Sequence, residues 1–580
     1  MAIAPGKGGR PQEVAPSPLR RALALGKGPI LFAGLFSLVS NLLYLALPIY
    51  TNQIYSRVLS SQSISTLVVL TLGIAFVFII STIIDHFREQ VLNGFGAVFD
   101  QQVASHVFAA LFDAVVRRQG TRAQALRDLD TVRQAISGPA IGVLFDLPWM
   151  PIFMLILFVV DPWIGVCTLI GGVILVLLAF LQDRATHSAL KVASNAAIQS
   201  YGFTESALRN GEIVRALGML PRLGAQWAGF RQLSVSAGSA ASERGAIYGG
   251  AIRYVRMLIQ ILIIALGAYL VVERKIPSGL LFANMILGAR ALAPLERVVG
   301  SWKSLFESVQ AFKRLEAALA DYEPPVPLTQ LPVPKGQLAV ENVNFAPAGA
   351  PALVLINLSF GIAAGEMVGI VGPSGAGKST LARLLVGIWK PIGGSVRLDG
   401  ADVYSWDRED FGRHVAYQPQ DTELFAGTVR DNIARFRTDA EDADVIRAAQ
   451  AAGAHELILR LPNGYDTDLG EGGAVLSAGQ RQRVGLARTL FGDPKLVVLD
   501  EPNANLDQEG EAALAKAILS LRERGATIVM ISHKPSAFQH ADKLLVLQGG
   551  HIKMYGPRDE VLQQLSAPRP QRPPLAEVRG

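Results

Sequence analysis

The residues best suited to chemistry form one continuous run in the second half of the chain. The run consists of Gly372, Pro373, Ser374, Gly375, Ala376, Gly377, Lys378, Ser379 and Thr380. Glycines at this spacing let successive backbone N–H groups point inward at phosphate oxygens. Lys378 would neutralise the β- and γ-phosphates, and the Ser379 hydroxyl would bind Mg²⁺. The run therefore predicts that the chain binds a nucleoside triphosphate, and the alternative is a chance glycine-rich turn.

Two flanking segments would hold this loop in place. Met367–Val371 is an apolar run typical of a buried strand, and Leu381–Leu385 is typical of the first turns of a helix. A glycine-rich loop between a strand and a helix is the context in which this motif binds phosphate. The helix N-terminus would add unpaired N–H groups and partial positive charge.

A pair of carboxylates follows a second apolar run, Leu496–Leu499. At the tip of a parallel strand beside the loop, Asp500 would hold Mg²⁺ and Glu501 would polarise the attacking water. An apolar strand followed by Asp-Glu is also a common structural pattern. Its position downstream of a phosphate loop favours the catalytic interpretation.

Composition places the chain among membrane proteins with more than one domain. The chain has 580 residues, of which 50% are hydrophobic and 18% charged, against a usual charged share of about 25%. The net charge is +6, but no Lys/Arg stripe interleaves with aromatic residues, so we expect no nucleic-acid partner. The single cysteine, Cys167, excludes an intramolecular disulfide and a cysteine metal cluster.

Six apolar segments are candidates for membrane spans of about 20 residues each. They cover about 29–50, 64–84, 140–160, 164–182, 250–272 and 276–292, and the last two are the weaker. Basic residues concentrate before the first span and in the long segments after spans two and four, which the positive-inside rule places in the cytoplasm. Both chain ends then lie inside, so the number of spans is even, and we predict six.

The remaining segments divide the chain. We expect a disordered cytoplasmic tail at 1–22, a transmembrane domain at 23–322, a proline-rich linker at 323–336, a soluble α/β domain at 337–562 and a disordered tail at 563–580. The third span is unusual because it contains Asp146 with Pro148 and Pro151. A carboxylate in hydrocarbon should face water or a partner. Two interpretations stay open: a packing kink near the interface, or an element that lines or gates a conduit.

Leu476-Ser-Ala-Gly-Gln480 resembles the signature of ATP-binding-cassette (ABC) proteins, with signature residues Ser477, Ala478, Gly479 and Gln480. The resemblance implies ATP and Mg²⁺ as cofactors. It also implies that Gln420 belongs to the loop linking nucleotide to membrane domain and joins Ser379 and Asp500 around the metal. His533 matches the switch histidine near the γ-phosphate, and Asn505-Leu-Asp507 the loop after the carboxylates. Gln418 is the weaker alternative to Gln420.

Two residues depart from the family pattern. Ala478 replaces the first signature glycine, which puts a methyl group where backbone approaches the γ-phosphate. The tyrosine that stacks on adenine is missing from Val343–Pro347, where Phe345 is the nearest aromatic residue. Phe345 is therefore either the adenine contact or part of the core.

The membrane half resembles type I protein-secretion transporters of the subgroup that exports proteases, lipases and repeat-containing proteins. The matching segments are Tyr55–Ser61, Phe145–Pro151, Asp161–Gly165, Glu212–Met219, Leu266–Val271 and Gly288–Pro294. The resemblance implies a six-helix transmembrane domain of the type 1 ABC-exporter fold fused to an α/β P-loop ATPase domain. Because the signature of one subunit completes the ATP site of another, it implies a homodimer.

The same resemblance implies ATP-driven export of an unfolded polypeptide across the inner membrane of a Gram-negative cell. The expected partners are a periplasmic adaptor, an outer-membrane channel, membrane lipid and a secreted protein with an uncleaved C-terminal signal. We expect no N-terminal peptidase-like domain before the first span. One alternative is an exporter of lipids or small molecules. A second, a regulatory or DNA-repair ATPase, is disfavoured by the first 320 residues, because its soluble relatives lack spans.

Overall fold

The computed structural model describes residues 17–116, 124–320, 322, 331–347, 349–504, 506 and 508–566. The chain divides into two compact units, residues 1–113 with 121–323 and residues 114–120 with 324–580. We call them the helical unit and the α/β unit.

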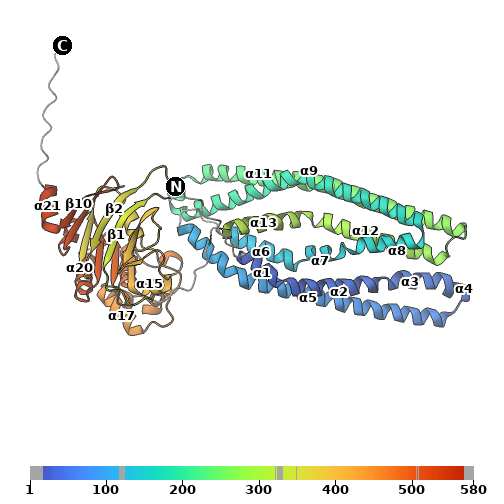
Figure 1. Ribbon diagram of the computed structural model, residues 1–580, viewed down its shortest axis with the longest axis horizontal. Helices are drawn as coiled ribbons and strands as arrows, with labels where there is room; N and C mark the ends of the chain where they lie inside the picture. The colour runs from blue at the N-terminus through green and yellow to red at the C-terminus, as the bar shows by residue number, and fades with distance from the viewer. Residues whose placement is uncertain are drawn as a thin grey trace, which may run out of the picture. The chain divides into compact units, whose positions relative to one another are not determined.

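The helical unit consists of long helices with short connections (Figure 1). Three helices, α5, α9 and α11, are 53, 48 and 53 residues long. The bounds are α1 Pro18–Leu25, α2 Lys27–Tyr44, α3 Ala46–Gln53, the π-helical turn η1 Ile54–Val58, α4 Leu59–Ser61, α5 Ile64–Val116, α6 Gln124–Ser137, α7 Pro139–Asp146, α8 Trp149–Val160, α9 Pro162–Arg209, α10 Gly211–Ala216, α11 Leu220–Val272, α12 Ser278–Gly300 and α13 Trp302–Ala320.

Six helical stretches of the described chain are long and apolar enough to span a membrane. They are Lys27–Ser61, Ile64–Val116, Gln124–Val160, Pro162–Arg209, Leu220–Val272 and Ser278–Gly300. The weak pair predicted at 250–272 and 276–292 therefore both qualify. The third stretch is interrupted between α7 and α8, at the site of Pro148, because proline cannot donate a helical backbone hydrogen bond.

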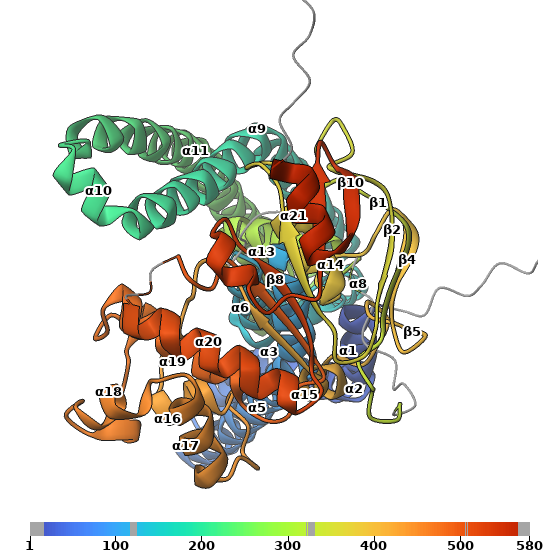
Figure 2. The same cartoon turned by 90° about the vertical axis from the view of Figure 1, so that its left-hand side faces the viewer.

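Local sequence explains where several of these helices begin and turn. Asp161 caps α9, since its carboxylate accepts hydrogen bonds from the backbone N–H groups of Trp163 and Ile164. The helices α9 and α11 pack along each other, and α10 lies at the turn between them (Figure 2). In the turn after α11, Arg274 has a left-handed backbone conformation, with a φ of 56°.

Two predicted boundaries of the terminal tails are wrong by a few residues. The N-terminal tail was expected to reach residue 22, but α1 begins at Pro18, and its Leu19 and Ala22 are buried in a cluster with Phe95 and Leu315. This apolar face stabilises a helix where composition indicated disorder. The C-terminal tail was expected from 563, but α21 (Arg558–Ser566) extends past it.

The α/β unit contains two sheets among its described residues. An antiparallel sheet has the order β2-β1-β4-β5, and a six-stranded sheet has the order β10-β9-β3-β8-β7-β6. The strands are β1 Leu338–Phe345, β2 Leu355–Ile362, β3 Met367–Val371, β4 Gly393–Leu398, β5 Ala401–Asp402, β6 Val415–Gln418, β7 Leu496–Asp500, β8 Thr527–Ile531, β9 Lys543–Gln548 and β10 His551–Pro557.

Helices cover the six-stranded sheet, as Figure 2 shows for α14 and α20. The helices are α14 Lys378–Leu385, α15 Arg408–His414, α16 Val429–Ile433, α17 Asp442–Ala451, α18 His455–Leu459, α19 Ala478–Leu490, α20 Gln508–Glu523 and α21, with short 3₁₀ turns between them.

Parallel pairing brings the functional ends of three strands to one edge of the sheet. Strand β3 pairs in parallel with β8, and β8 pairs in parallel with β7. The residues of these strands are almost fully buried, which explains their continuous apolar sequences. The loop after β3 and the carboxylates at the end of β7 therefore lie at the same carboxyl edge, where ligands bind in open α/β sheets.

Candidate functional site

The phosphate loop runs from the end of β3 into α14. Gly372 lies so close to β9 that a Cβ atom there would come within 2.2 Å of the Leu547 carbonyl oxygen. Gly377 has a φ of 99° and precedes the first residue of α14, a conformation that residues with a side chain rarely adopt. Pro373, Ser374 and Gly375 are exposed, and Ala376 is buried. Glycine is thus required at two positions for different reasons.

Lys378 is folded back onto the loop in the described structure. Its ammonium donates hydrogen bonds to the carbonyl oxygens of Gly372 (2.9 Å) and Pro373 (3.1 Å). Burial lowers the pKa of the Lys378 ammonium, and the carboxylates of Glu501 and Asp500 act in the opposite direction. A partly desolvated cation on a glycine-rich loop at a helix N-terminus is an arrangement suited to a phosphate.

Asp500, the last residue of β7, is 1% exposed, and neither of its carboxylate oxygens has a hydrogen-bond partner among the described residues. Burial raises the pKa of this carboxyl, and the neighbouring Ser379 hydroxyl lies close enough to lower it in part. Buried carboxylate oxygens are normally paired or coordinate metals. Asp500 beside Ser379 therefore fits a divalent cation with oxygen ligands such as Mg²⁺.

Glu501 lies between two other polar side chains at this edge. The Gln420 Nε2 donates to the Glu501 Oε2 at 3.2 Å, and the His533 Nε2 lies 3.2 Å from the Glu501 Oε1. The Glu501 backbone has a φ of 51°, which is uncommon for a residue with a side chain. Its N–H donates to the Ile531 carbonyl oxygen at 2.9 Å, which anchors this conformation to β8.

The structure brings together most residues predicted for the site. Glu501, Gln420 and His533 come from the ends of β7, β6 and β8, and each follows its strand directly or by a few residues. Gln418, the alternative to Gln420, is 1% exposed and lies within β6. Gln420 is exposed and contacts the catalytic carboxylate candidate. Asn505 and Asp507 lie outside the described residues.

The signature residues form the exposed start of α19. The Ser477 hydroxyl accepts from the Gln480 N–H at 3.3 Å, and the Gln480 Oε1 accepts from the Ser477 N–H at 2.9 Å. This reciprocal capping box fixes the first turn of the helix. Ser477 and Ala478 are exposed. No hydrogen bond within the described chain joins residues 477–480 to the phosphate loop.

Phe345 does not present a free ring to an adenine base. It is 6% exposed and stacks on Trp389, with ring centroids 5.1 Å apart and an interplanar angle of 8°. The structure therefore favours the core interpretation of Phe345 over the adenine contact. The reason is the alternation along β1, which points Val343 and Phe345 into the same buried cluster.

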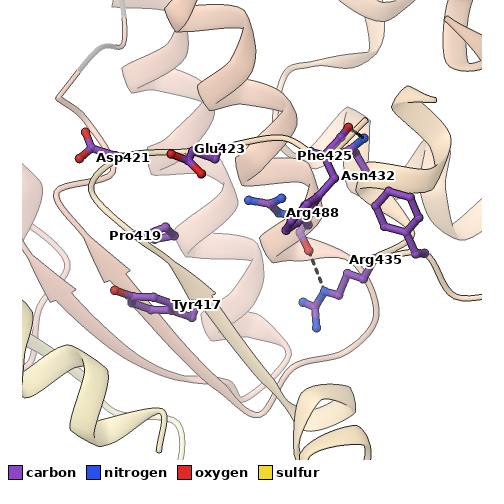
Figure 3. Close-up of a pocket in the computed structure, with 9 residues that line it drawn as sticks. Tyr417, Pro419, Asp421, Glu423, Phe425, Asn432, Arg435 and Arg488 are labelled. Atoms are coloured by element: carbon purple, nitrogen blue, oxygen red, sulfur yellow. Dashed lines mark hydrogen bonds between the residues drawn. The ribbon is translucent and has the colours of Figure 1, made fainter. Parts of the chain in front are cut away.

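A pocket of about 410 Å³ beside the Gln420 segment was not predicted from the sequence. Figure 3 shows its lining side chains. Phe425 and Phe436 are 62% and 50% exposed and meet edge to face at 6.0 Å. The full lining is Tyr417, Pro419, Asp421, Glu423, Phe425, Asn432, Arg435, Phe436 and Arg488.

Two half-buried arginines, Arg435 and Arg488, line this pocket. The Arg435 guanidinium donates to backbone carbonyl oxygens, including that of Arg488 at 3.0 Å (Figure 3), and burial lowers its pKa to about 10. Arg435 and Phe436 both have positive φ angles, of 56° and 57°. Strained backbone of this kind clusters at functional sites. In the sequence, the only signal was an aromatic residue shortly after Gln420.

Comparisons with known proteins agree with this architecture. The family model described as ABC transporter transmembrane region matches residues 30–289, and the ABC transporter model matches residues 355–504. The chain is 43% identical over 539 residues to the type I secretion system ATP-binding protein PrsD of Rhizobium meliloti, with 92% of each chain covered. The chain belongs to the ABC transporters of type I secretion systems.

This ABC transporter is also similar to a second secretion protein and to a solved exporter structure. It is 30% identical to the cyclolysin secretion/processing ATP-binding protein CyaB of Bordetella pertussis, over 91% of this chain and 75% of that protein. A solved structure of a bacterial Atm1-family ABC exporter with ATP bound superposes with a TM-score of 0.82 at 25% identity, covering 95% and 97% of the two chains. The predicted family and fold class are confirmed, and this multi-pass membrane protein is an ATP-hydrolysing transporter.

Proposed function

We propose that this ABC transporter exports an unfolded polypeptide across the bacterial inner membrane, driven by ATP and acting as a homodimer. The observation that carries the proposal is the 43% identity to a type I secretion ATP-binding protein along both units of the chain. The relative from Bordetella pertussis is named as a cyclolysin secretion/processing ATP-binding protein. Polypeptide is therefore the cargo class that the relatives favour.

Hydrolysis would use the residues at the carboxyl edge of the six-stranded sheet. Lys378 would exchange the Gly372 and Pro373 carbonyls for phosphate oxygens, because a full negative charge attracts an ammonium more strongly than a neutral carbonyl. Glu501 would orient and polarise the attacking water, with His533 close to the γ-phosphate. These roles require no rearrangement of the strands.

Ser379 and Asp500 would hold Mg²⁺, with Gln420 as a third oxygen donor. The Gln420 amide oxygen accepts no hydrogen bond from any described residue, so it is available to a cation. Bound there, Mg²⁺ would withdraw charge from the β- and γ-phosphates. The protein contributes the two Asp500 carboxylate oxygens, which are buried and have no hydrogen-bond partner among the described residues.

A second copy of the chain would complete each ATP site. The exposed start of α19, with Ser477, Gly479 and the helix N-terminus, is suited to a γ-phosphate presented by the phosphate loop of the partner copy. Each chain carries one phosphate loop and one signature, so two copies make two equivalent sites. ATP would then join two α/β units, and hydrolysis would release them.

The pocket near Gln420 would receive the tip of the α9–α11 hairpin from a second copy. In α10 and the residues after it, Ile213, Leu217 and Leu220 are 55%, 71% and 69% exposed. The tip also carries Arg215, whereas Asp421 and Glu423 line the pocket. Apolar side chains meeting Phe425 and Phe436 would couple ATP closure to the membrane helices.

The expected cellular location and partner proteins follow from the family and from the distribution of basic residues along the chain. The N-terminus and the α/β unit would lie in the cytoplasm, because the basic residues concentrate in the long segments and not in the turns. A periplasmic adaptor and an outer-membrane channel would continue the path. The secreted substrate would carry an uncleaved C-terminal signal.

Secretion by a Glu501→Gln variant tests the proposal. In a strain that lacks the native gene, wild-type protein should release a candidate C-terminal-signal protein into the medium. Glu501→Gln should reduce release by about 100-fold or more, the usual contribution of a general base. Glu523→Gln is the matched control, because Glu523 is exposed at the end of α20. Undiminished secretion at normal Glu501→Gln protein levels would contradict the proposed mechanism.

A further inference from the structure

The helical unit contains a charged cluster that the proposed reaction does not use. We call it the Asp146 cluster. It joins α2, α5, α7 and α12, four helices from distant parts of the sequence. Its charged members are Asp85, Arg88, Asp146, Arg290 and Arg297, and its neutral members are Ser37, Ser40, Asn41 and Tyr44.

Both carboxylate oxygens of Asp146 have hydrogen-bond or ion-pair partners. It is 5% exposed, and its Oδ2 lies 2.8 Å from the Arg297 Nη1. Its Oδ1 accepts from the Ser37 Oγ and the Asn41 Nδ2, at 3.4 and 3.3 Å, and lies 3.7 Å from the Arg88 Nη1. The Asp146 carboxylate therefore has no unused side for a transported molecule. Of the two interpretations of Asp146, the structure favours the packing role.

Arg290 differs from the other two arginines of the cluster. Its Nη2 donates to the Asn41 Oδ1 at 3.2 Å, and its guanidinium lies 3.8 Å from the centre of the Tyr44 ring. Both contacts are neutral, and no described carboxylate lies within ion-pair distance of it. With two carboxylates and three guanidiniums, the cluster carries one surplus positive charge, and Arg290 holds it.

The position of Arg290 along α12 makes this surplus charge costly. The charged turn Glu273–Lys275 precedes α12 and marks one membrane surface. Arg290 is 12 residues after Ser278, which is about 18 Å at the helical rise of 1.5 Å per residue. If a hydrocarbon layer of about 30 Å begins at that turn, Arg290 lies inside it, near the middle of the apolar stretch Ser278–Gly300. Ionised residues at such depth mark substrate pathways.

We propose that Arg290 binds a carboxylate of the polypeptide in transit, as an anion-binding site in the membrane domain. The inference rests on the proposed function, since it names the chemistry by which that same cargo is recognised. Arg290 is only partly buried, and its described contacts, Asn41 and Tyr44, are both neutral. Guanidinium and carboxylate form strong charge-assisted hydrogen bonds. Asp146, with Arg88 and Arg297, holds α2, α5, α7 and α12 around the site.

Peptide binding to the full-length protein tests this site. The protein is placed in phosphatidylcholine nanodiscs, without anionic lipid. The probes are two labelled 20-residue Gly/Ser peptides with blocked ends, one containing four Asp and the other four Asn. Wild-type protein should bind the Asp peptide about tenfold more tightly, as expected for one hydrogen-bonded charge pair. Arg290→Gln should abolish the difference, and Arg290→Lys should keep part of it.

Arg253→Gln is the matched control, because Arg253 is an exposed arginine on α11, and it should keep the full difference. A difference that survives Arg290→Gln would overturn the inference. Equal binding of the two peptides would overturn it as well, while leaving polypeptide export intact. If neither peptide binds, both the inference and polypeptide export are contradicted. If phosphatidylglycerol in the nanodisc abolishes the preference, the site belongs to a lipid phosphate and the inference is wrong.

Discussion

Asp146 and Asp500 are both buried aspartates, and the protein treats them in opposite ways. Asp146, in the helical unit, is surrounded by two guanidiniums, a hydroxyl and an amide. Asp500, in the α/β unit, has no hydrogen-bond partner for either oxygen among the described residues. Their exposed fractions are 5% and 1%, so burial alone does not distinguish them.

The difference indicates what each carboxylate is for. An unpaired buried carboxylate destabilises the fold, and the fold retains it only where a bound ion supplies the missing partner. A fully paired carboxylate holds helices together and has no free side for a ligand. Pairing, rather than burial or position after an apolar run, therefore separates the binding carboxylate from the structural one.

The largest effect should come from removing the charge of Asp500. Asp500→Asn should reduce Mg²⁺-dependent ATP hydrolysis by about 100-fold or more, because the metal loses its anionic ligand. Thermal stability without nucleotide should stay the same or rise, since a buried carboxylate that lacks a hydrogen-bond partner among the described residues loses its charge. ATPase assays and thermal unfolding of the purified protein measure the two quantities. A large loss of stability would show that Asp500 is structural, as Asp146 is.

Removing the charge of Asp146 should give the opposite pattern. Asp146→Asn leaves Arg297 without its carboxylate and should destabilise the helical unit by about 2 kcal/mol. This value is below that of a fully buried pair, because the Arg297 side chain is 46% exposed. Thermal unfolding in detergent measures the change, with ATP affinity as the comparison. An unaltered unfolding temperature would mean that the ion pairs of the cluster contribute little.

The pH dependence of stability should also distinguish the two units. Burial raises the pKa of Asp500 in the folded protein above its unfolded value, so the folded state binds the proton more tightly. The stability from this group is present below the unfolded pKa, near 3.9, and is lost as the pH rises through the folded pKa. Unfolding temperatures measured against pH without Mg²⁺ should show this loss in wild type. Asp500→Asn should lack that part of the slope.

The smallest effect concerns the surface that completes the site. Ala478 is exposed at the start of α19, so its methyl group disturbs no core packing. Ala478→Gly should strengthen ATP-dependent dimerisation of an ATPase-inactive Glu501→Gln background by a few-fold, roughly 0.5–1 kcal/mol. Analytical ultracentrifugation with ATP measures the change. An unchanged dimerisation constant would show that alanine is fully compatible with closure.

The sequence predicted those parts of the site that are local in the chain. The phosphate loop, the Asp500–Glu501 pair and the capping residue Ser477 each lie within a few residues of the strand or helix that positions them. Composition and hydropathy sufficed for the six spans, because length and apolar content are the physical requirements for crossing a membrane. The apolar runs of β3, β7 and β8 indicate strands buried on both faces, as in a parallel sheet, but they do not specify the order of the strands.

Long-range partners could not be predicted in this way. The partners of Asp146 come from Ser37, Arg88 and Arg297, on three other helices, and no pattern in one sequence specifies their pairing. Phe345 lies in a strand whose alternation fits a buried ring and an exposed ring equally well until the register is known. The pocket beside Gln420 depends on the left-handed backbone of Arg435 and Phe436, which glycine-poor sequence does not signal.

The π-helical turn η1 lets the first span accommodate one extra residue. An i→i+5 turn holds one residue more than the α-helical turn that it replaces. Within it, Tyr55 stacks on Phe282 of α12, with ring centroids 3.9 Å apart. Deleting one residue from 54–58 would convert this turn into regular α-helix, and the α-helical residues on either side would keep their phase, so the change would fall on the contact between Tyr55 and Phe282. The turn therefore lets the first span hold one more residue than regular α-helix would, without resetting the helical phase of the residues that follow up to Ser61.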